Sequence, residues 1–547
     1  MRAWNSLGAG RHPLWLILLS ALWLATGANL PLWRQLATLP ELQNTRGLVF
    51  AAGLGAALFL LFVTALSLLA WRWSLKPVLA VFFVSAAAGA YFMLSYGVVI
   101  DSTMMANVLQ TDAREVRDLL NWRLLAALVL LGVVPSVVAW RCTVRPLGWV
   151  RSVLTRLGVA LLAFAAMCGV LLMIFQDFSS VMRNHTQVRY LINPLNSFYA
   201  VGMLAAKHNR VDSGALRPLG RDARLGAAGP GDKPPLIVLV LGETARSASF
   251  GINGYQRQTT PRLALEDVAT LRNVWSCGTS TAASLPCMFS GLGRAGFESS
   301  TENSENLLDV LQRAGLAVLW IDNQSGCKGV CDRIPSLNTK ALTLPAFCRS
   351  GECLDEVMLQ QVDQRIAELP ADRRSRGVVV VMHQLGSHGP AYYKRTPQSF
   401  KQFLPECQSN ALQECDQAHV VNTYDNTILY TDHFLTQTIR WLKTAERTSA
   451  TAMVYVSDHG ESLGENNLYL HGLPYRAAPA VQKQVPWITW LSPAIERQRG
   501  VSLRCLRAKT DAPLSHDNYF HSVLGLAGVQ TGAYRVDLDI YANCGAP

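Results

Sequence analysis

The chain has 547 residues and a formal net charge of +11, and its composition divides it into two regions. Residues 1–175 are mostly apolar, whereas the rest has the composition of an ordinary globular protein. The positive charge does not gather into a Lys/Arg-rich run, which argues against nucleic acid as a partner. A basic exterior near a membrane favours anionic lipids instead.

Five apolar runs of membrane-spanning length lie in the first region, near residues 13–31, 48–70, 78–99, 124–140 and 154–175. The first could instead be a signal peptide, because Arg2 and Arg11 precede it and small residues end it, but four more runs follow without a soluble domain between them. Lys and Arg before the first run, after the second and between the last two place those loops in the cytoplasm. An odd number of spans then puts everything after residue 175 outside.

The loop between the third and fourth runs, residues 101–122, has the pattern of an amphipathic helix at the outer membrane surface. Asn107, Thr111 and Glu115 are spaced by four residues, so they would form one polar row along the helix. A solvated helix face is the alternative to a binding role. Residues 176–234 are expected to be a connector, with a short helix capped by Asn193 and a Gly/Pro-rich linker.

Residues 235–547 alternate apolar strands with helical segments. The runs 236–242, 317–322, 377–383 and 452–458 are apolar on both faces, as the central strands of parallel sheets are. Helical periodicity appears between them, for example in 304–315 and 422–445. We therefore predict an α/β sandwich with a mostly parallel sheet.

Polar residues follow three of these strands, at the edge where ligands of such sheets collect. Glu243 follows the first strand, Asp458 and His459 follow the last, and His383 and His388 follow the third. Two carboxylates and an imidazole suit zinc and leave a fourth position for a hydroxyl or a substrate oxygen. A strand-end Asp alone often caps a helix, so the joint placement is what indicates a metal site. We interpret His383 as structural.

The candidate nucleophile, Thr281, lies in a hydroxyl-rich loop between Cys277 and Cys287. A disulfide would stiffen this loop, and a metal would lower the pKa of the hydroxyl. Taken alone, Thr281 is more simply explained as a cap of the following helix, and only the other site residues of the chain favour the nucleophile. Ten of the twelve cysteines lie in the second region, which suits an oxidising compartment, with a structural zinc site as the alternative. The close pairs are Cys277 and Cys287, Cys327 and Cys331, Cys348 and Cys353, and Cys407 and Cys415; Cys505 and Cys544 could form a fifth bridge.

Four further residues could handle a substrate. Ser325 and Lys328 follow the strand at 317–322, where the lysine could neutralise a phosphate, although a polar loop held by a disulfide is the alternative. His388 and His471 could donate to phosphate, act as a general acid for a leaving group, or bind a second metal.

Six motifs carry a resemblance to a known family. GETAR, CGTSTAASLPCMFSGL, DNQSGCKGVC, GSHGPAYY, NTYDNTILYTDHFL and SDHGESLGENNLYLHGLPY, in this order behind five apolar runs, resemble those of the lipid A phosphoethanolamine transferases, which include colistin-resistance enzymes. The resemblance covers nearly the whole chain. It implies a five-helix transmembrane domain at 1–175 in a bacterial inner membrane and a periplasmic catalytic domain at 235–547, similar to alkaline phosphatases and sulfatases.

The resemblance also implies residue roles. The zinc ligands fall on Glu243, Thr281, Asp458 and His459, with Thr281 as the nucleophile that becomes modified by phosphoethanolamine. The donor-binding residues fall on Asn107, Thr111, Glu115, Ser325, Lys328, His388 and His471. The implied reaction transfers phosphoethanolamine from phosphatidylethanolamine to lipid A, which reduces the attraction for cationic peptides such as polymyxins; we expect a monomer. A phosphoglycerol transferase or phosphodiesterase on the same scaffold, and a non-catalytic lipid-binding protein, are the alternatives.

Overall fold

The computed structural model describes residues 12–69, 71–111, 113–210, 216–342, 344–349, 352–542 and 544. The chain forms two compact units. One contains the chain up to Met105 and Leu120–Met203, and the other contains Ala106–Leu119 and Leu204–Pro547. Two of the boundaries fall inside the helices α5 (Ser102–Gln110) and α11 (Leu195–Arg210), and the third lies directly after Leu119.

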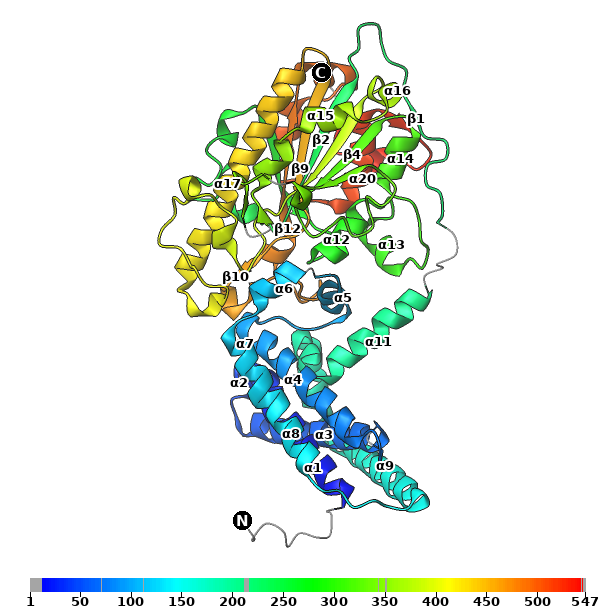
Figure 1. Cartoon of the computed structure of the whole chain (residues 1–547), viewed down its shortest axis with the longest axis vertical. Coiled ribbons are helices and arrows are strands. Elements are labelled where there is room, and N and C mark those ends of the chain that lie inside the picture. The colour runs from blue at the N-terminus through cyan, green and yellow to red at the C-terminus, as the bar shows by residue number, and fades with distance from the viewer. Residues whose placement is uncertain are drawn as a thin grey trace. The chain divides into compact units, whose positions relative to one another are not determined.

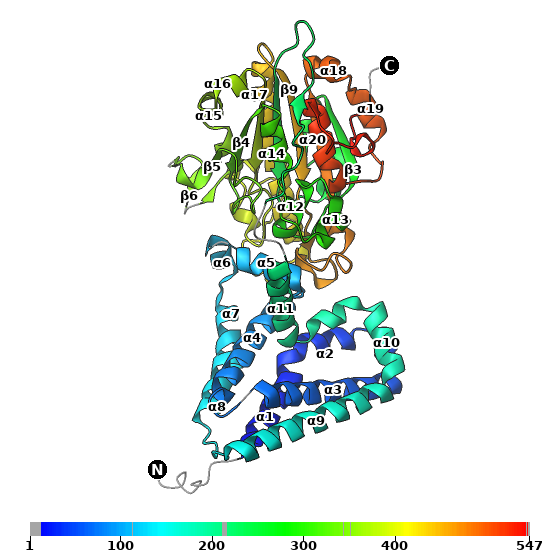
Figure 2. The ribbon, with the colours of Figure 1, turned by 90° about the vertical axis from the view of Figure 1, so that its right-hand side faces the viewer.

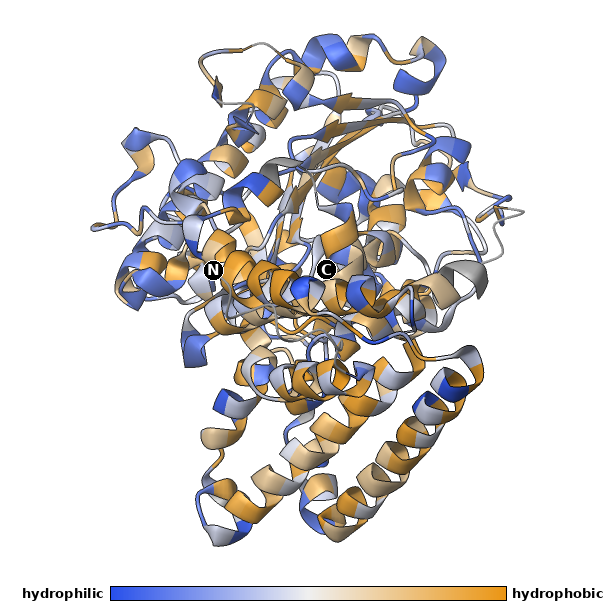
Figure 3. Cartoon of the chain, turned by 60° about the horizontal axis from the view of Figure 1, so that its bottom comes forward, coloured by the Kyte–Doolittle hydropathy of each residue, from blue (hydrophilic) through white to orange (hydrophobic). Residues whose placement is uncertain are grey.

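The first unit contains five helical segments that are long and apolar enough to cross a membrane, which confirms the five predicted spans. Figure 3, coloured by residue hydropathy, shows that hydrophobic residues predominate along these helices. Several of them are exposed; Leu161 and Leu162, for example, are 69% and 73% exposed. Such exposure suits lipid rather than water. The segments are Pro13–Ala37, formed by α1 (Pro13–Ala25) and α2 (Leu30–Ala37); α3 (Thr45–Leu69); α4 (Leu75–Tyr96); Trp122–Arg141, formed by α7 (Trp122–Ala127), a π-helical turn (Leu128–Val133) and α8 (Val134–Arg141); and α9 (Trp149–Met173).

Two buried asparagines fasten the first unit together. Asn29, at the break between α1 and α2, donates from Nδ2 to Asn193 O at 2.6 Å and accepts from Asn193 N at 2.8 Å. Asn193 donates from its own Nδ2 to Ala86 O of α4 at 2.6 Å, and its Oδ1 has no hydrogen-bond partner among the described residues. The predicted capping role of Asn193 is therefore wrong, because its side chain is committed to the helix bundle.

The loop between the third and fourth spans forms two helices, α5 and α6 (Ala113–Leu119), so the predicted single helix over 101–122 is wrong. The hydroxyl of Thr111 donates to Asn107 O at 2.8 Å. A hydroxyl that binds the carbonyl four residues back competes with the helical hydrogen bond and favours an end or a bend. The expected polar row is therefore interrupted, and the side chain of Glu115 lies outside the described residues.

The second unit is built on an eight-stranded sheet in the order β13-β3-β12-β9-β2-β8-β4-β5. The four predicted strands are its central parallel strands β2 (Pro235–Gly242), β4 (Ala317–Asp322), β8 (Val378–His383) and β9 (Ala450–Ser457). Sequence patterns did not reveal β3 (Val268–Trp275), β12 (Gln484–Leu491), β5 (Ser336–Asn338) or β13 (Leu514–Ser515). Only β12 runs antiparallel to its neighbours within this sheet, which confirms a mostly parallel arrangement.

Helices cover both faces of the sheet (Figures 1 and 2). The long helix α17 (Gln417–Ala445) lies on one face, while α12 (Thr281–Met288), α14 (Leu307–Arg313) and α20 (Tyr519–Ala527) lie on the other. Inward side chains of β2 share one buried cluster with those of α14 and α20. The other elements are α10 (Phe175–Asn184), α13 (Gly293–Ser299), α15 (Val362–Ala367), α16 (Ala371–Arg374), α18 (Pro493–Arg499) and α19 (Leu503–Ala508), with the strand pairs β1 (Arg224–Leu225) and β14 (Val529–Gln530), β6 (Cys348–Arg349) and β7 (Glu352–Cys353), and β10 (Ser462–Leu463) and β11 (Tyr469–Leu470).

Five disulfides fasten the loops of this unit. The four close cysteine pairs are bonded as expected, and Cys505 is bonded to Cys544. The remaining cysteines, Cys142 and Cys168, belong to the first unit and are free.

Candidate active site

The carboxyl ends of β2 and β9 bring three potential metal ligands together. Glu243 follows β2, and Asp458 and His459 follow β9, which is the neighbouring strand in the sheet. His459 Nε2 lies 3.4 Å from Glu243 Oε1 and 3.4 Å from Asp458 Oδ2, and all three side chains are fully buried. Their ligand atoms lie within 4.8 Å of one another.

Thr281 completes this group. Its Oγ1 donates to Glu243 Oε2 at 3.0 Å and lies 3.5 Å from His459 Nε2. Ser280 is the N-cap of α12 and Thr281 is the first helical residue, so the hydroxyl of Thr281 is directed at the carboxylate instead of capping the helix. The N-terminus of a helix favours negative charge, which suits an anionic group approaching this hydroxyl.

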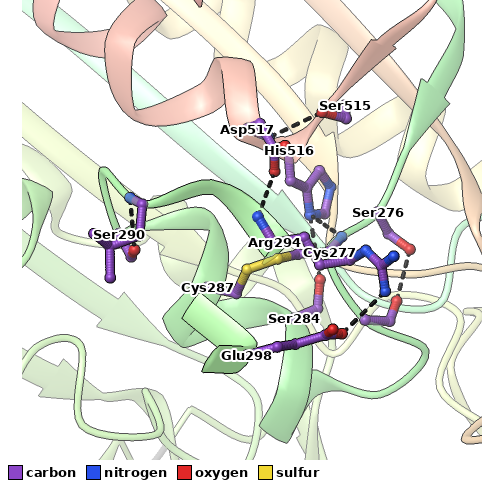
Figure 4. The surroundings of a disulfide bond; sticks show 12 residues. Ser276, Cys277, Ser284, Cys287, Ser290, Arg294, Glu298, Ser515, His516 and Asp517 are labelled. Atoms are coloured by element: carbon purple, nitrogen blue, oxygen red, sulfur yellow. Dashed lines mark hydrogen bonds and ion pairs between the residues drawn. A yellow bond between two sulfur atoms is a disulfide. The ribbon is translucent and has the colours of Figure 1, made fainter. Parts of the chain in front are cut away.

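A histidine from a distant part of the chain supports the loop that carries Thr281 (Figure 4). His516 Nδ1 accepts from Cys277 N at 3.1 Å, and His516 Nε2 donates to Ser457 O at 3.0 Å. Ser284 Oγ lies 3.2 Å from the same Nδ1 and donates to Asp458 O at 2.5 Å. Together with the Cys277–Cys287 disulfide, these contacts fix the start of α12 against the end of β9.

The charges of the group depend on one another. Burial alone would lower the pKa of His459, but the two carboxylates outweigh it and raise that pKa to about 10. Burial, reinforced by the nearby Glu243, raises the pKa of Asp458. Burial also opposes ionisation of Glu243, yet its hydrogen bond and attraction to His459 lower its pKa. The carboxylates of Glu243 and Asp458 thus favour a positive charge at the position between them, next to His459.

A divalent cation fits this arrangement. Asp458 Oδ2 is buried and has no hydrogen-bond partner among the described residues, although it lies close to His459 Nε2. A buried polar atom without a partner costs free energy, which a bound cation would recover. Two carboxylates, one imidazole and one hydroxyl are a donor set that zinc accepts.

Two further histidines line up beside His459. The ring of His471 lies 4.4 Å from that of His459 and 5.7 Å from that of His388, centroid to centroid. His471 Nδ1 lies 2.9 Å from Glu461 Oε2, which fixes the orientation of its ring. His459, Glu461 and His471 also form a second group with metal-ligand spacing.

Lys328 and Ser325 contact each other, with Nζ 3.0 Å from Oγ. Lys328 also donates to Gln110 O at 3.4 Å, one residue before Thr111. The neighbouring Gln324 donates to Glu243 Oε2 at 2.8 Å and so connects this loop to the buried group. The structure therefore brings the loop after β4 to the edge occupied by Glu243, while Asn107 and Thr111 lie at the end of α5.

Gln324 and His516 were missed by sequence reasoning. Gln324 follows β4, so the rule that selected Glu243 and Asp458 could have selected it. His516 follows β13, a two-residue strand without an apolar pattern, and carried no such signal. His383, which we interpreted as structural, is fully buried with Nδ1 2.8 Å from Asp322 Oδ1.

Comparisons with known proteins agree with this geometry. Residues 235–529 match the sulfatase family, and residues 58–209 match the family described as phosphoethanolamine transferase EptA/EptB. Phosphoethanolamine transferase EptA of Salmonella typhimurium is 39% identical over 534 residues, covering 97% of this chain and 96% of that protein. Phosphatidylethanolamine transferase Mcr-1 of Escherichia coli is 36% identical over 527 residues, covering 94% of this chain and 95% of that protein.

A solved structure extends the similarity to the whole chain. Integral membrane lipooligosaccharide phosphoethanolamine transferase A (EptA) from Neisseria meningitidis has a TM-score of 0.92 and 36% identity, covering 97% of this chain and 99% of that one. The resemblance inferred from the motifs is thus confirmed, and so are the five-helix membrane region and the sulfatase-like α/β domain. On this evidence, the chain belongs to the phosphoethanolamine transferase family.

Proposed function

We propose that the chain is a zinc-dependent enzyme that transfers phosphoethanolamine from phosphatidylethanolamine to a phosphate of lipid A through a covalent intermediate on Thr281. The observation that carries the proposal is the hydrogen bond from Thr281 Oγ1 to Glu243, within a buried group that also contains Asp458 and His459. The expected setting is the periplasmic side of the inner membrane. The expectation of a monomer is supported only by the origin of Glu243, Thr281, Asp458 and His459, which all come from one chain.

The reaction has two steps. Thr281 Oγ1 passes its proton to Glu243, to which it donates, and forms a bond to the phosphorus of phosphatidylethanolamine while the bond to the diacylglycerol oxygen breaks. An acceptor phosphate oxygen then attacks the same phosphorus, and Thr281 takes the proton back as it is released. Bound at Glu243, Thr281, Asp458 and His459, zinc would lower the pKa of the hydroxyl and polarise the phosphoryl group. Glu243 orients the hydroxyl of Thr281, and Gln324 holds Glu243 in turn.

The substrate-handling roles follow from position. His471 or the adjacent His388 gives a proton to the departing diacylglycerol oxygen, a role supported by the contact of His471 with Glu461 and by the closeness of the two rings. Lys328 supplies a point charge for the donor phosphate, and Ser325 holds its ammonium group. Asn107, Thr111 and Glu115 stay proposed donor contacts of the loop between the third and fourth spans.

The test separates donor, nucleophile and acceptor. Purified full-length protein is incubated with phosphatidylethanolamine alone, and its intact mass is measured; we expect one added phosphoethanolamine in the wild type and none in Thr281→Ala. Ser280→Ala is the matched control, because the Ser280 hydroxyl is buried without a hydrogen-bond partner among the described residues. Lipid A from a Gram-negative host lacking this activity should gain phosphoethanolamine only with a protein that forms the adduct.

The outcomes distinguish the alternatives. An adduct from phosphatidylglycerol instead of phosphatidylethanolamine would indicate a phosphoglycerol transferase. Diacylglycerol release without transfer to lipid A would indicate a phosphodiesterase, and binding without an adduct would indicate a non-catalytic protein. If Ser280→Ala lost the adduct and Thr281→Ala kept it, the nucleophile would be Ser280, and our assignment to Thr281 would be wrong.

A further inference from the structure

A cavity of about 640 Å³ lies in the second unit, and the proposed reaction does not use it. Its wall is formed by α6, by the β6–β7 hairpin and by the loop between residues 385 and 401. Its volume falls within the range of pockets that hold small organic ligands.

The charges of the cavity favour an anion. Five cationic residues and two acidic residues line it. Asp118 pairs with Lys394 and Arg395, Glu352 also pairs with Arg395, and Lys401 pairs with Glu406 outside the lining. Arg117 and Arg349 are exposed in the cavity wall and have no ion-pair partner in the part of the chain that the structure describes. Two guanidinium groups are therefore left to bind a ligand.

The rest of the wall suits a sugar ring attached to that anion. Phe347, Leu354, Tyr393 and Pro397 line the cavity and are half-buried, so each leaves part of an apolar surface accessible. Aromatic faces with a few charged groups at the margin bind amphipathic ring ligands, and a guanidinium group binds phosphate in a bidentate manner.

The cavity is connected to the active site through one loop. Leu385 lines the cavity, and the next two residues lie against Glu243. Gly386, with φ of +53°, is so close that an added Cβ would lie 2.9 Å from Glu243 O, and Ser387 N donates to that oxygen at 3.1 Å. Further along, Arg395 in the cavity floor donates to His388 O at 3.1 Å. A ligand in the cavity therefore lies one loop away from a proposed zinc ligand and a proposed proton donor.

We propose that this cavity binds a second phosphate group of the acceptor, one that is not the phosphate attacking the intermediate on Thr281, together with the sugar that carries it. The inference rests on the proposed function, because it assigns a binding site to the acceptor of that reaction. Arg117 and Arg349 are the residues that recognise the phosphate.

Binding is measured on full-length Thr281→Ala protein in detergent, so that no turnover occurs. The probes are bisphosphorylated lipid A and each of its two monophosphorylated forms, with inorganic phosphate as a competitor. We expect the bisphosphorylated form to bind about tenfold more tightly, as expected for one charge-assisted contact. The double substitution Arg117→Ala and Arg349→Ala should abolish this preference.

The matched control is the double substitution Arg497→Ala and Arg504→Ala, which removes two exposed arginines on α18 and α19 that do not line the cavity. It should keep the preference. The inference would be overturned if the preference for bisphosphorylated lipid A persisted without Arg117 and Arg349. It would also be overturned if inorganic phosphate at equal concentration removed this preference, because the cavity would then bind only a free ion.

The donor step gives an independent readout. Without the Thr281 substitution, the Arg117/Arg349 variant should form the phosphoethanolamine adduct at the wild-type rate while its KM for the bisphosphorylated acceptor rises about tenfold. A parallel loss of adduct formation would show that the arginines support the catalytic loop, against the inference. If the wild type forms no adduct but still prefers the second phosphate, the proposed function fails and the binding site stands.

Discussion

Replacement of Asp118 by asparagine should release α6 from the catalytic domain. Asp118 binds Lys394 and, at 3.2 Å, Arg395, and both Asp118 and Arg395 are buried, with side-chain exposures of 8% and 3%. The substitution keeps the shape but removes the charge, which leaves Arg395 with Glu352 as its only acidic partner among the described residues. Residues 388–395 then lose both ion pairs with Asp118 and keep the Arg395–Glu352 pair.

The magnitude follows from burial. Breaking a fully buried ion pair costs about 3–5 kcal/mol, but the Lys394 side chain is 39% exposed, so its share is discounted. We expect the opening of α6 to become easier by about 2–3 kcal/mol, which corresponds to an increase of about 30- to 150-fold in the open population.

Hydrogen exchange of the full-length protein in detergent measures this change at 116–119 and 388–395. The control is Asp267→Asn, which breaks a surface pair with Arg507 whose side chains are 73% and 44% exposed, and which should change exchange by less than about 1 kcal/mol. Equal protection of both segments in the wild type and Asp118→Asn would refute the reasoning, as would an equal effect of the control.

Three further results are expected. Removal of divalent cations should abolish adduct formation and lower Tm. Zinc but not magnesium should restore both, because the ligand set includes an imidazole and tetrahedral sites suit zinc. Full activity after exhaustive chelation would contradict this. Burial lowers the pKa of His516 to about 3, so the neutral side chain contributes its full stabilisation above the usual pKa of 6.5, and up to about 4–5 kcal/mol of it is lost as the pH falls toward 3. The free energy of unfolding of His516→Asn, measured with denaturant, should therefore depend less on pH between 6.5 and 3 than that of the wild type. An unchanged pH dependence would contradict this. Loss of the Cys277–Cys287 disulfide, with a sequence separation of 10, should cost about 2–3 kcal/mol of stability and also reduce adduct formation. Loss of Cys407–Cys415, with a separation of 8, should cost similar stability but leave adduct formation unchanged. Tm measures the first effect and intact mass the second.

The sequence revealed features whose signal is local. β2, β4, β8 and β9 are apolar on both faces, and Glu243, Asp458 and His459 follow them directly, so strand pattern and strand-end chemistry could be read together. The motifs then added Thr281, whose helix-cap alternative could not be excluded by spacing alone.

Features that depend on tertiary contacts could not be read in this way. The helix expected over 101–122 ends near Thr111 because a side-chain hydroxyl competes with the backbone, and helical periodicity does not register that competition. Likewise, Asn193 has the sequence of a helix cap, but packing commits it to Ala86. His516 reaches the nucleophile loop from a part of the chain more than two hundred residues away.

The buried pair Asn29 and Asn193 also determines which substitutions the third span tolerates. By hydropathy and helix propensity, alanine at Gly89 would be an improvement. However, a methyl group there would lie 2.4 Å from Asn193 Oδ1, whose amide is held by Ala28 and Ala86 and so has little freedom to move away. The third span and the segment just before α11 therefore constrain each other's sequence, and variation in one should be interpreted only together with the other.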